Sequence, residues 1–257
     1  MAFEFTSIEI ANLRIDEPVT VLTDLVVSAV CFWGFYKLTL LPNKNKVHHY
    51  LKYYFLSMGI ATFIGGMVGH GFLYLFKTEW HLSAEFAGTI KSIVGEKNMH
   101  VTANPWKLPG WLTSMFAVML VERASIEYAR SIIKPGVAKF FAWFNIVELL
   151  FFVTITFSTL NFFFVEAHTF YGFMIIVLSF NLIIYYRTRS RGSRAFLIAV
   201  AFAAAAALTF MNKWTIHKYY NFFDLSHTLM AISAYMFYRG SKYIIEHPVE
   251  SEPVVVD

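Results

Sequence analysis

Seven apolar stretches, each long enough to cross a lipid bilayer, divide this chain of 257 residues. A transmembrane helix needs about 20 mostly apolar residues, because the hydrocarbon core is about 30 Å thick. Hydrophobic residues make up 57% of the chain and charged residues only 15%, against about 25% charged residues in a soluble domain. The sequence therefore predicts an all-α integral membrane bundle of seven transmembrane helices. They span residues 19–41, 51–76, 108–129, 136–158, 162–186, 193–212 and 219–241.

This pattern divides the chain into three parts. Residues 1–18 form an extramembrane N-terminal segment, residues 19–243 the seven-helix transmembrane domain, and residues 244–257 a disordered acidic tail. The one long loop, 78–107, has apolar residues at helical spacing and predicts an interfacial helix. The third stretch is the least apolar, because it contains Glu122, Arg123 and Glu127. We assign all three residues to one packing network, since Arg123 and Glu127 are spaced to neutralise each other.

Lysine and arginine residues indicate the orientation, because cytoplasmic loops carry an excess of them. With the N-terminus outside, thirteen Lys and Arg residues lie at the cytoplasmic ends and seven lie on the outer side. We therefore expect the N-terminus outside, the C-terminus in the cytoplasm, and a plasma (inner) membrane location. The expected partners are the lipid bilayer and a lipid substrate. No nucleic acid is expected, because the positive residues are separated by apolar segments.

Ionisable side chains occur inside these apolar stretches. Asp24, His70, Asp224 and His227 lie roughly 8–12 Å from the outer ends of their helices, by helical rise. An ionisable group at the bilayer centre costs about 2.5–3.5 kcal/mol, so it usually faces the bundle interior and has a partner. We expect these four residues to be mutual neighbours, with the rings of His70 and His227 within about 8 Å of each other. Glu166 and His168 have a similar depth and are further candidates.

Imidazole and carboxylate groups together suit zinc or a similar divalent ion. Asp224 and His227 are three residues apart and share a helix face. The predicted metal ligands are His70, His227 and Asp224, with Asp24 or Asp224 as the catalytic base. The alternative is that an Asp–His hydrogen bond merely pins the last helix against the first two. Deeper in the bundle, Asn145 and Glu148 either extend a polar cavity or bond to a neighbouring helix.

Three stretches are also similar to those of known membrane proteins: EPVTVLTDL at 17–25, GGMVGHGF at 65–72 and YNFFDLSHTLMAISAYMFYRG at 220–240. They resemble the signature stretches of a poorly characterised family of seven-helix membrane proteins. More distantly, the layout is similar to the CREST superfamily, which includes alkaline ceramidases and PAQR receptors. That resemblance implies seven helices and a zinc site with His70 and His227 at ligand positions. The superfamily's second histidine in the last helix is absent here, so Asp224 or a group of the fifth helix would replace it.

Two classes of function follow. The first is an intramembrane, metal-dependent hydrolase that acts on a lipid amide or ester. The second is a non-enzymatic channel, transporter or receptor in which the same polar groups line an ion or proton path. The metal content of the purified protein distinguishes them.

Overall fold

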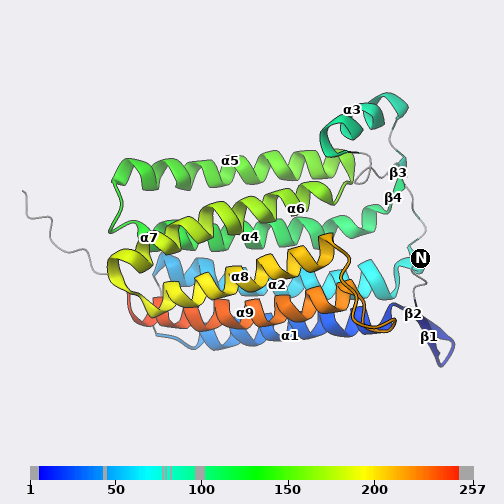
Figure 1. Cartoon of the computed structure of the whole chain (residues 1–257), viewed down its shortest axis with the longest axis horizontal. Coiled ribbons are helices and arrows are strands. Elements are labelled where there is room, and N and C mark those ends of the chain that lie inside the picture. Colours follow the sequence, from blue (N-terminus) through cyan, green and yellow to red (C-terminus); the bar gives the residue numbers. More distant parts are fainter. Residues whose placement is uncertain are drawn as a thin grey trace, which may run out of the picture.

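The structure is a computed structural model that describes residues 6–42, 45–76, 78, 80–81, 83–95 and 102–248. Within these residues, seven long helical segments run side by side and form an elongated bundle (Figure 1). The segments are α1 (Pro18–Thr39), α2 (Lys46–Ile64) continued by η1 (Gly65–Gly71), α4 (Leu108–Ala129), α5 (Pro135–Thr159), α6 (Phe163–Phe170) continued by η5 (Tyr171–Val177) and α7 (Leu178–Thr188), α8 (Arg191–Met211), and α9 (Phe222–Glu246). The prediction of an all-α bundle is confirmed.

Local signals at the helix starts explain several boundaries. Proline occupies the first turn of α1, α4 and α5, where its fixed φ suits a helix and its missing N–H is not needed. Asn45 caps α2 by accepting a hydrogen bond from His48 N. Asn221 caps α9 in a capping box that it completes with Asp224. These caps satisfy backbone N–H groups that have no partner within the helix.

Five of the long helical segments are long and apolar enough to cross a membrane: Pro18–Thr39, Lys46–Gly71, Pro135–Thr159, Phe163–Thr188 and Arg191–Met211. The other two are α4 and α9, which carry charged and polar residues and are therefore less apolar. Outward faces of the bundle are strongly apolar. On α5, for example, Trp143 is 65% exposed and Phe157 is 63% exposed. Such faces suit a lipid environment, because a soluble monomer rarely exposes large apolar patches.

Helix α4 lies within the bundle and packs against α2, α5, α6, α7 and η5 (Figure 1). Helices α8 and α9 pack closely through small residues. Gly192 and Gly240 face each other, and a Cβ built on Gly240 would lie 2.9 Å from Gly192 O. Ser233 Oγ donates to Ala199 O at 2.8 Å across the same interface. Small residues and interhelical hydrogen bonds of this kind are how helices associate in membranes.

The short elements gather at the end of the bundle where the chain begins (Figure 1). Strands β1 (Ser7–Ile10) and β2 (Leu13–Asp16) form an antiparallel hairpin with Ile10 opposite Leu13. Strands β3 (Trp80–His81) and β4 (Thr102–Ala103) pair nearby, and η2 (Leu73–Leu75) and η4 (Pro105–Lys107) are short 3-10 turns. The helix expected in the long loop is α3 (Ala84–Val94), which buries Ile90 and Val94 against Phe164.

The C-terminal boundary differs from the expectation. The tail was predicted to be disordered from residue 244, but α9 continues to Glu246. Its last turn is helical because Ile244 and Ile245 are buried, with Ile244 against Gly192. Residues 249–257 of the predicted tail lie outside the described residues.

Candidate functional site

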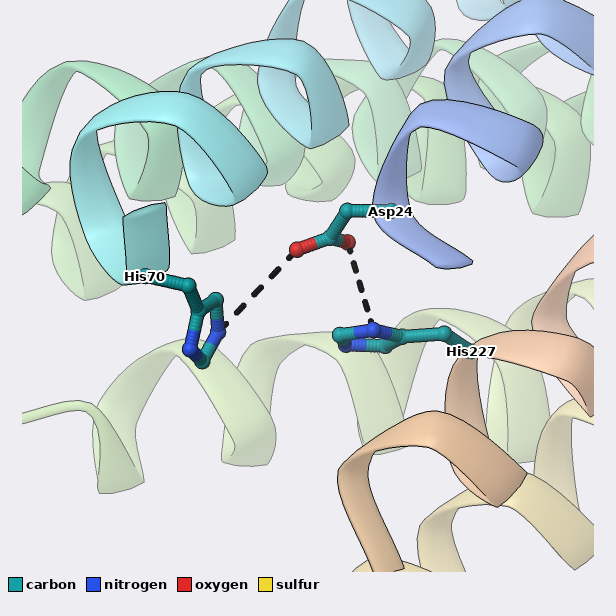
Figure 2. Close-up of side chains that lie close together, drawn as sticks. All are labelled: Asp24, His70 and His227. Carbon is teal, nitrogen blue, oxygen red and sulfur yellow. Dashed lines mark ion pairs between the residues drawn. The ribbon is translucent and has the colours of Figure 1, made fainter. Parts of the chain in front are cut away.

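Asp24, His70 and His227 meet near the end of the bundle that carries the β1–β2 hairpin, and we call them the first cluster. They come from α1, η1 and α9, which are far apart in the sequence. Figure 2 shows the Asp24 carboxylate between the two imidazole rings, with one oxygen directed at each ring. His70 Nε2 lies 4.0 Å from Asp24 Oδ2, and His227 Nδ1 lies 3.6 Å from Asp24 Oδ1. The ring centroids are 6.0 Å apart, so the expected separation within 8 Å is confirmed.

Glycine residues of η1 allow this approach. A Cβ built on Gly66 would lie 2.8 Å from Asp24 Cβ, and one on Gly71 would lie 3.0 Å from Val21 Cγ2. The segment Gly65–Gly71 is a π-helix, and short π-helical segments occur frequently at functional sites. The glycine-rich sequence around His70 therefore brings η1 against α1, so that the His70 ring reaches Asp24.

Further polar groups contact the two rings. His70 Nδ1 lies 3.1 Å from Glu17 Oε2, and His227 Nδ1 lies 3.2 Å from Thr23 Oγ1. If Nδ1 of His70 donates to Glu17, the lone pair of Nε2 faces Asp24. Carboxylates that hold a ligating histidine in this way are typical of metal sites.

Glu17 is a functional candidate that the sequence reasoning missed. It precedes Pro18, before the first apolar stretch, and its φ of 46° places it in the left-handed region. Non-glycine residues rarely adopt that conformation, and it costs free energy unless the surroundings hold it. Here Glu17 N donates to Thr6 O at 2.8 Å. Burial lowers the pKa of Lys107 at the start of α4, and the Glu17 carboxylate opposes this effect.

Asp224 is adjacent to the first cluster, but its two oxygens have other partners. Oδ1 accepts from Thr20 Oγ1 at 2.8 Å, and Oδ2 accepts from Asn221 N at 2.7 Å. The capping box of α9 therefore accounts for its position. Among the described residues, the potential metal ligands that come together here are Asp24, His70 and His227, whose ligand atoms all lie within 4.8 Å of one another.

The spacing in the first cluster fits a bound metal ion. Contacts of 3.6 and 4.0 Å exceed the range of a hydrogen bond, which ends near about 3.2 Å for N–H···O. Tetrahedral zinc, with bonds of about 2.0–2.1 Å, places its ligand atoms roughly 3.3 Å apart. The side chains of His70 and His227 are 18% and 12% exposed. Three ligands with a partly open face are the arrangement found at catalytic zinc sites.

Two further expectations are wrong. His168 does not join the first cluster, because its Nδ1 lies 2.7 Å from Glu148 Oε1 and its Nε2 lies 2.9 Å from Met115 O. Glu122 does not join the Arg123–Glu127 ion pair; its Oε2 accepts from Asn145 Nδ2 at 3.0 Å.

Glu122, Glu148 and His168 form a second cluster of potential metal ligands. Glu166 is half-buried on α6 and belongs to neither cluster among the described residues.

Comparison with known proteins gives a family but no activity. No curated protein and no solved structure matches the chain. A family of unknown function, DUF6962, matches residues 19–246, which cover the seven long helical segments except Pro18 and include both clusters. Because this match covers most of the chain, the protein belongs to the DUF6962 family.

Proposed function

We propose that the protein is an integral membrane protein that crosses the plasma membrane seven times, with its N-terminus outside and its C-terminus in the cytoplasm. Five segments meet the length and hydropathy expected of a span. Helices α4 and α9 are equally long, and their ionisable residues Glu122, Asp224 and His227 are turned toward partners within the bundle. A polar residue with an internal partner is compatible with a span. The excess of Lys and Arg at the opposite end of the bundle supports the orientation.

The orientation is tested with epitope tags read in intact and permeabilised cells. A tag before Met1 is expected to be accessible from outside, and a tag after Asp257 only after permeabilisation. A further tag in the loop between α4 and α5, at Ser131, serves as an internal control and is expected to be cytoplasmic. If both termini were on the same side, the number of spans would be even, and α4 or α9 would not cross the membrane.

We further propose that the first cluster binds zinc and that the protein is a metal-dependent hydrolase of a lipid amide or ester. One observation carries this proposal: the Asp24 carboxylate lies between two imidazoles at ligand-to-ligand spacing. Zinc held by three protein ligands acts as a Lewis acid and activates water near neutral pH. The resemblance to the CREST superfamily points to the same chemistry.

The protein's own residues have separable roles in this proposal. Asp24, His70 and His227 bind the ion, and Glu17 orients the His70 ring. Thr23 contacts the His227 nitrogen that faces Asp24, Nδ1, and would give up this contact when the ion binds. Asp224 fixes the start of α9 against α1 through Thr20, and it thereby positions His227 one turn later. A lipid substrate would reach the site sideways from the bilayer, along the apolar outer faces of the helices. Such an approach explains why a polar site could be catalytic although helices enclose it.

Replacing either histidine by glutamine is expected to remove one zinc equivalent per chain and to abolish hydrolysis of lipid amides and esters. The matched control is His217→Gln, because His217 is exposed at the same end of the bundle and its ring nitrogen Nδ1 accepts from Tyr219 N, outside the first cluster. Elemental analysis and a lipid-release assay on protein in nanodiscs measure both effects. A folded protein whose first cluster binds no metal would exclude the hydrolase and favour a channel, transporter or receptor.

A further inference from the structure

The second cluster lies inside the bundle, where α4, α5 and α6 meet. Glu122 and His168 are 0% exposed, Glu148 is 5% exposed, and the neighbouring Asn145 is 2% exposed. Gly172 in η5 makes the space for it, because a Cβ there would collide with Glu122 Oε1 and Val118. As in the first cluster, a π-helix with a glycine adjoins the polar residues. Nothing in the proposed hydrolase chemistry uses this site.

The hydrogen bonds of His168 fix which ring nitrogen faces the two carboxylates. Nε2 lies 2.9 Å from the backbone oxygen of Met115, and a carbonyl oxygen can only accept, so Nε2 carries the proton. Nδ1 is then the nitrogen that faces Glu148 Oε1 at 2.7 Å. Histidines that bind a metal usually donate their other ring N–H to a backbone carbonyl or a carboxylate, and His168 has this bond at Nε2, which leaves Nδ1 as its possible ligand atom.

The charge of the cluster favours a positive partner. If His168 is neutral and both glutamates are ionised, the site holds two negative charges with almost no solvent exposure; a protonated His168 would pair with Glu148 and offset only one of them. Buried charges are tolerated only when they are paired or bind a metal. A divalent cation would neutralise the two carboxylates completely. The Arg123 guanidinium on the same helix does not serve, because it pairs with Glu127 and donates to Ala142 O.

The cluster also has more acceptors than donors. Glu122 Oε1, Glu148 Oε2 and Asn145 Oδ1 are all buried and have no hydrogen-bond partner among the described residues. A proton placed on one of these oxygens would satisfy two of them at most, whereas one cation can contact several oxygens at once. Buried polar atoms without partners are uncommon in folded proteins, so three in one site call for an explanation.

We propose that the second cluster is a binding site for a divalent transition-metal ion, separate from the first cluster. Glu122, Glu148 and His168 are its protein ligands, and Asn145 Oδ1 is a fourth donor beside them. Neighbouring ligands of an octahedral ion with bonds of about 2.1 Å lie roughly 3 Å apart, close to the 2.7 Å between His168 Nδ1 and Glu148 Oε1. Because the site is enclosed, the ion ties three helices together and exchanges slowly.

The test uses purified full-length protein, dialysed against a chelator and analysed for all first-row metals. In the Asp24→Asn/His227→Gln background, which disables the first cluster, about one metal ion per chain is expected to remain. Adding Glu122→Gln and Glu148→Gln is expected to remove it. The matched control is Glu127→Gln, because Glu127 lies on the same helix as Glu122 but pairs with Arg130. This variant is expected to retain the metal.

Different results overturn the proposal. The Asp24→Asn/His227→Gln protein could be folded but metal-free, even when Mn²⁺, Fe²⁺ or Zn²⁺ is added to the growth medium during expression. In that case the second cluster binds protons and not a metal ion. If the protein that also carries Glu122→Gln and Glu148→Gln retains the metal, other residues bind it. If that protein does not fold, the metal content of His168→Asn in the same background decides in its place. Loss of metal from the second cluster alone leaves the hydrolase proposal for the first cluster intact.

Discussion

Replacing Gly172 in η5 with alanine is expected to destabilise the protein. The new Cβ would collide with both Glu122 Oε1 and Val118 Cγ1, and neither can withdraw easily, because both residues are buried in α4. Overpacking of a buried site costs about 1–3 kcal/mol. Displacement of the Glu122 carboxylate adds the cost of weakening its hydrogen bond with Asn145. The expected result is a lower midpoint of thermal unfolding in detergent.

Gly136→Ala is the control for this measurement. Gly136 lies in the first turn of α5, and a Cβ built there meets nothing within 4 Å. Alanine at such a helical position is expected to be neutral or to stabilise by up to about 1 kcal/mol. Equal midpoints for both variants would contradict the close contact between η5 and α4. Retention of metal by a destabilised Gly172→Ala protein would show that the collision is absorbed by Val118 and not by Glu122.

Most of the long helices were predictable from the sequence because five of the seven long segments are long, continuous apolar stretches. Helix α4 was recognised despite Glu122, Arg123 and Glu127, since the remaining residues are apolar. The first cluster was predictable for a similar reason. Helical rise gives the depth of a residue along its axis, and Asp24, His70 and His227 have both similar depth and glycine-mediated contact.

The second cluster was not predictable, because depth does not give the direction in which a side chain points around its helix. His168 has a depth similar to that of His70, yet it faces α4 and α5. That rotation depends on packing, including the π-helix η5 and the room left by Gly172. The β1–β2 hairpin was also missed. Its two-residue loop, Ala11-Asn12, has φ of 50° and 66°, but it lacks the glycine that usually marks such a loop in a sequence.

Asp24→Asn and Asp224→Asn are expected to affect different properties, zinc affinity and stability respectively, although both remove a carboxylate at the same end of the bundle. Asp24 is the only carboxylate that faces both rings of the first cluster among the described residues. Changing even a group that only orients a ligand typically lowers metal affinity about 10–100-fold, so loss of the Asp24 ligand should lower zinc affinity by at least that factor. The fold should persist, because asparagine has nearly the same shape.

Asp224→Asn is expected to leave zinc affinity nearly unchanged and to reduce stability. Asp224 Oδ2 accepts from Asn221 N and Oδ1 accepts from Thr20 Oγ1, and an asparagine amide keeps only one acceptor oxygen for these two donors. Loss of one such hydrogen bond costs about 1 kcal/mol. Zinc titration and thermal unfolding of both variants separate the two roles. If the two variants lost zinc equally, Asp224 would have to be a ligand, as the i,i+3 spacing with His227 suggested. The sequence assignment would then be right, and the capping geometry would describe only the metal-free state.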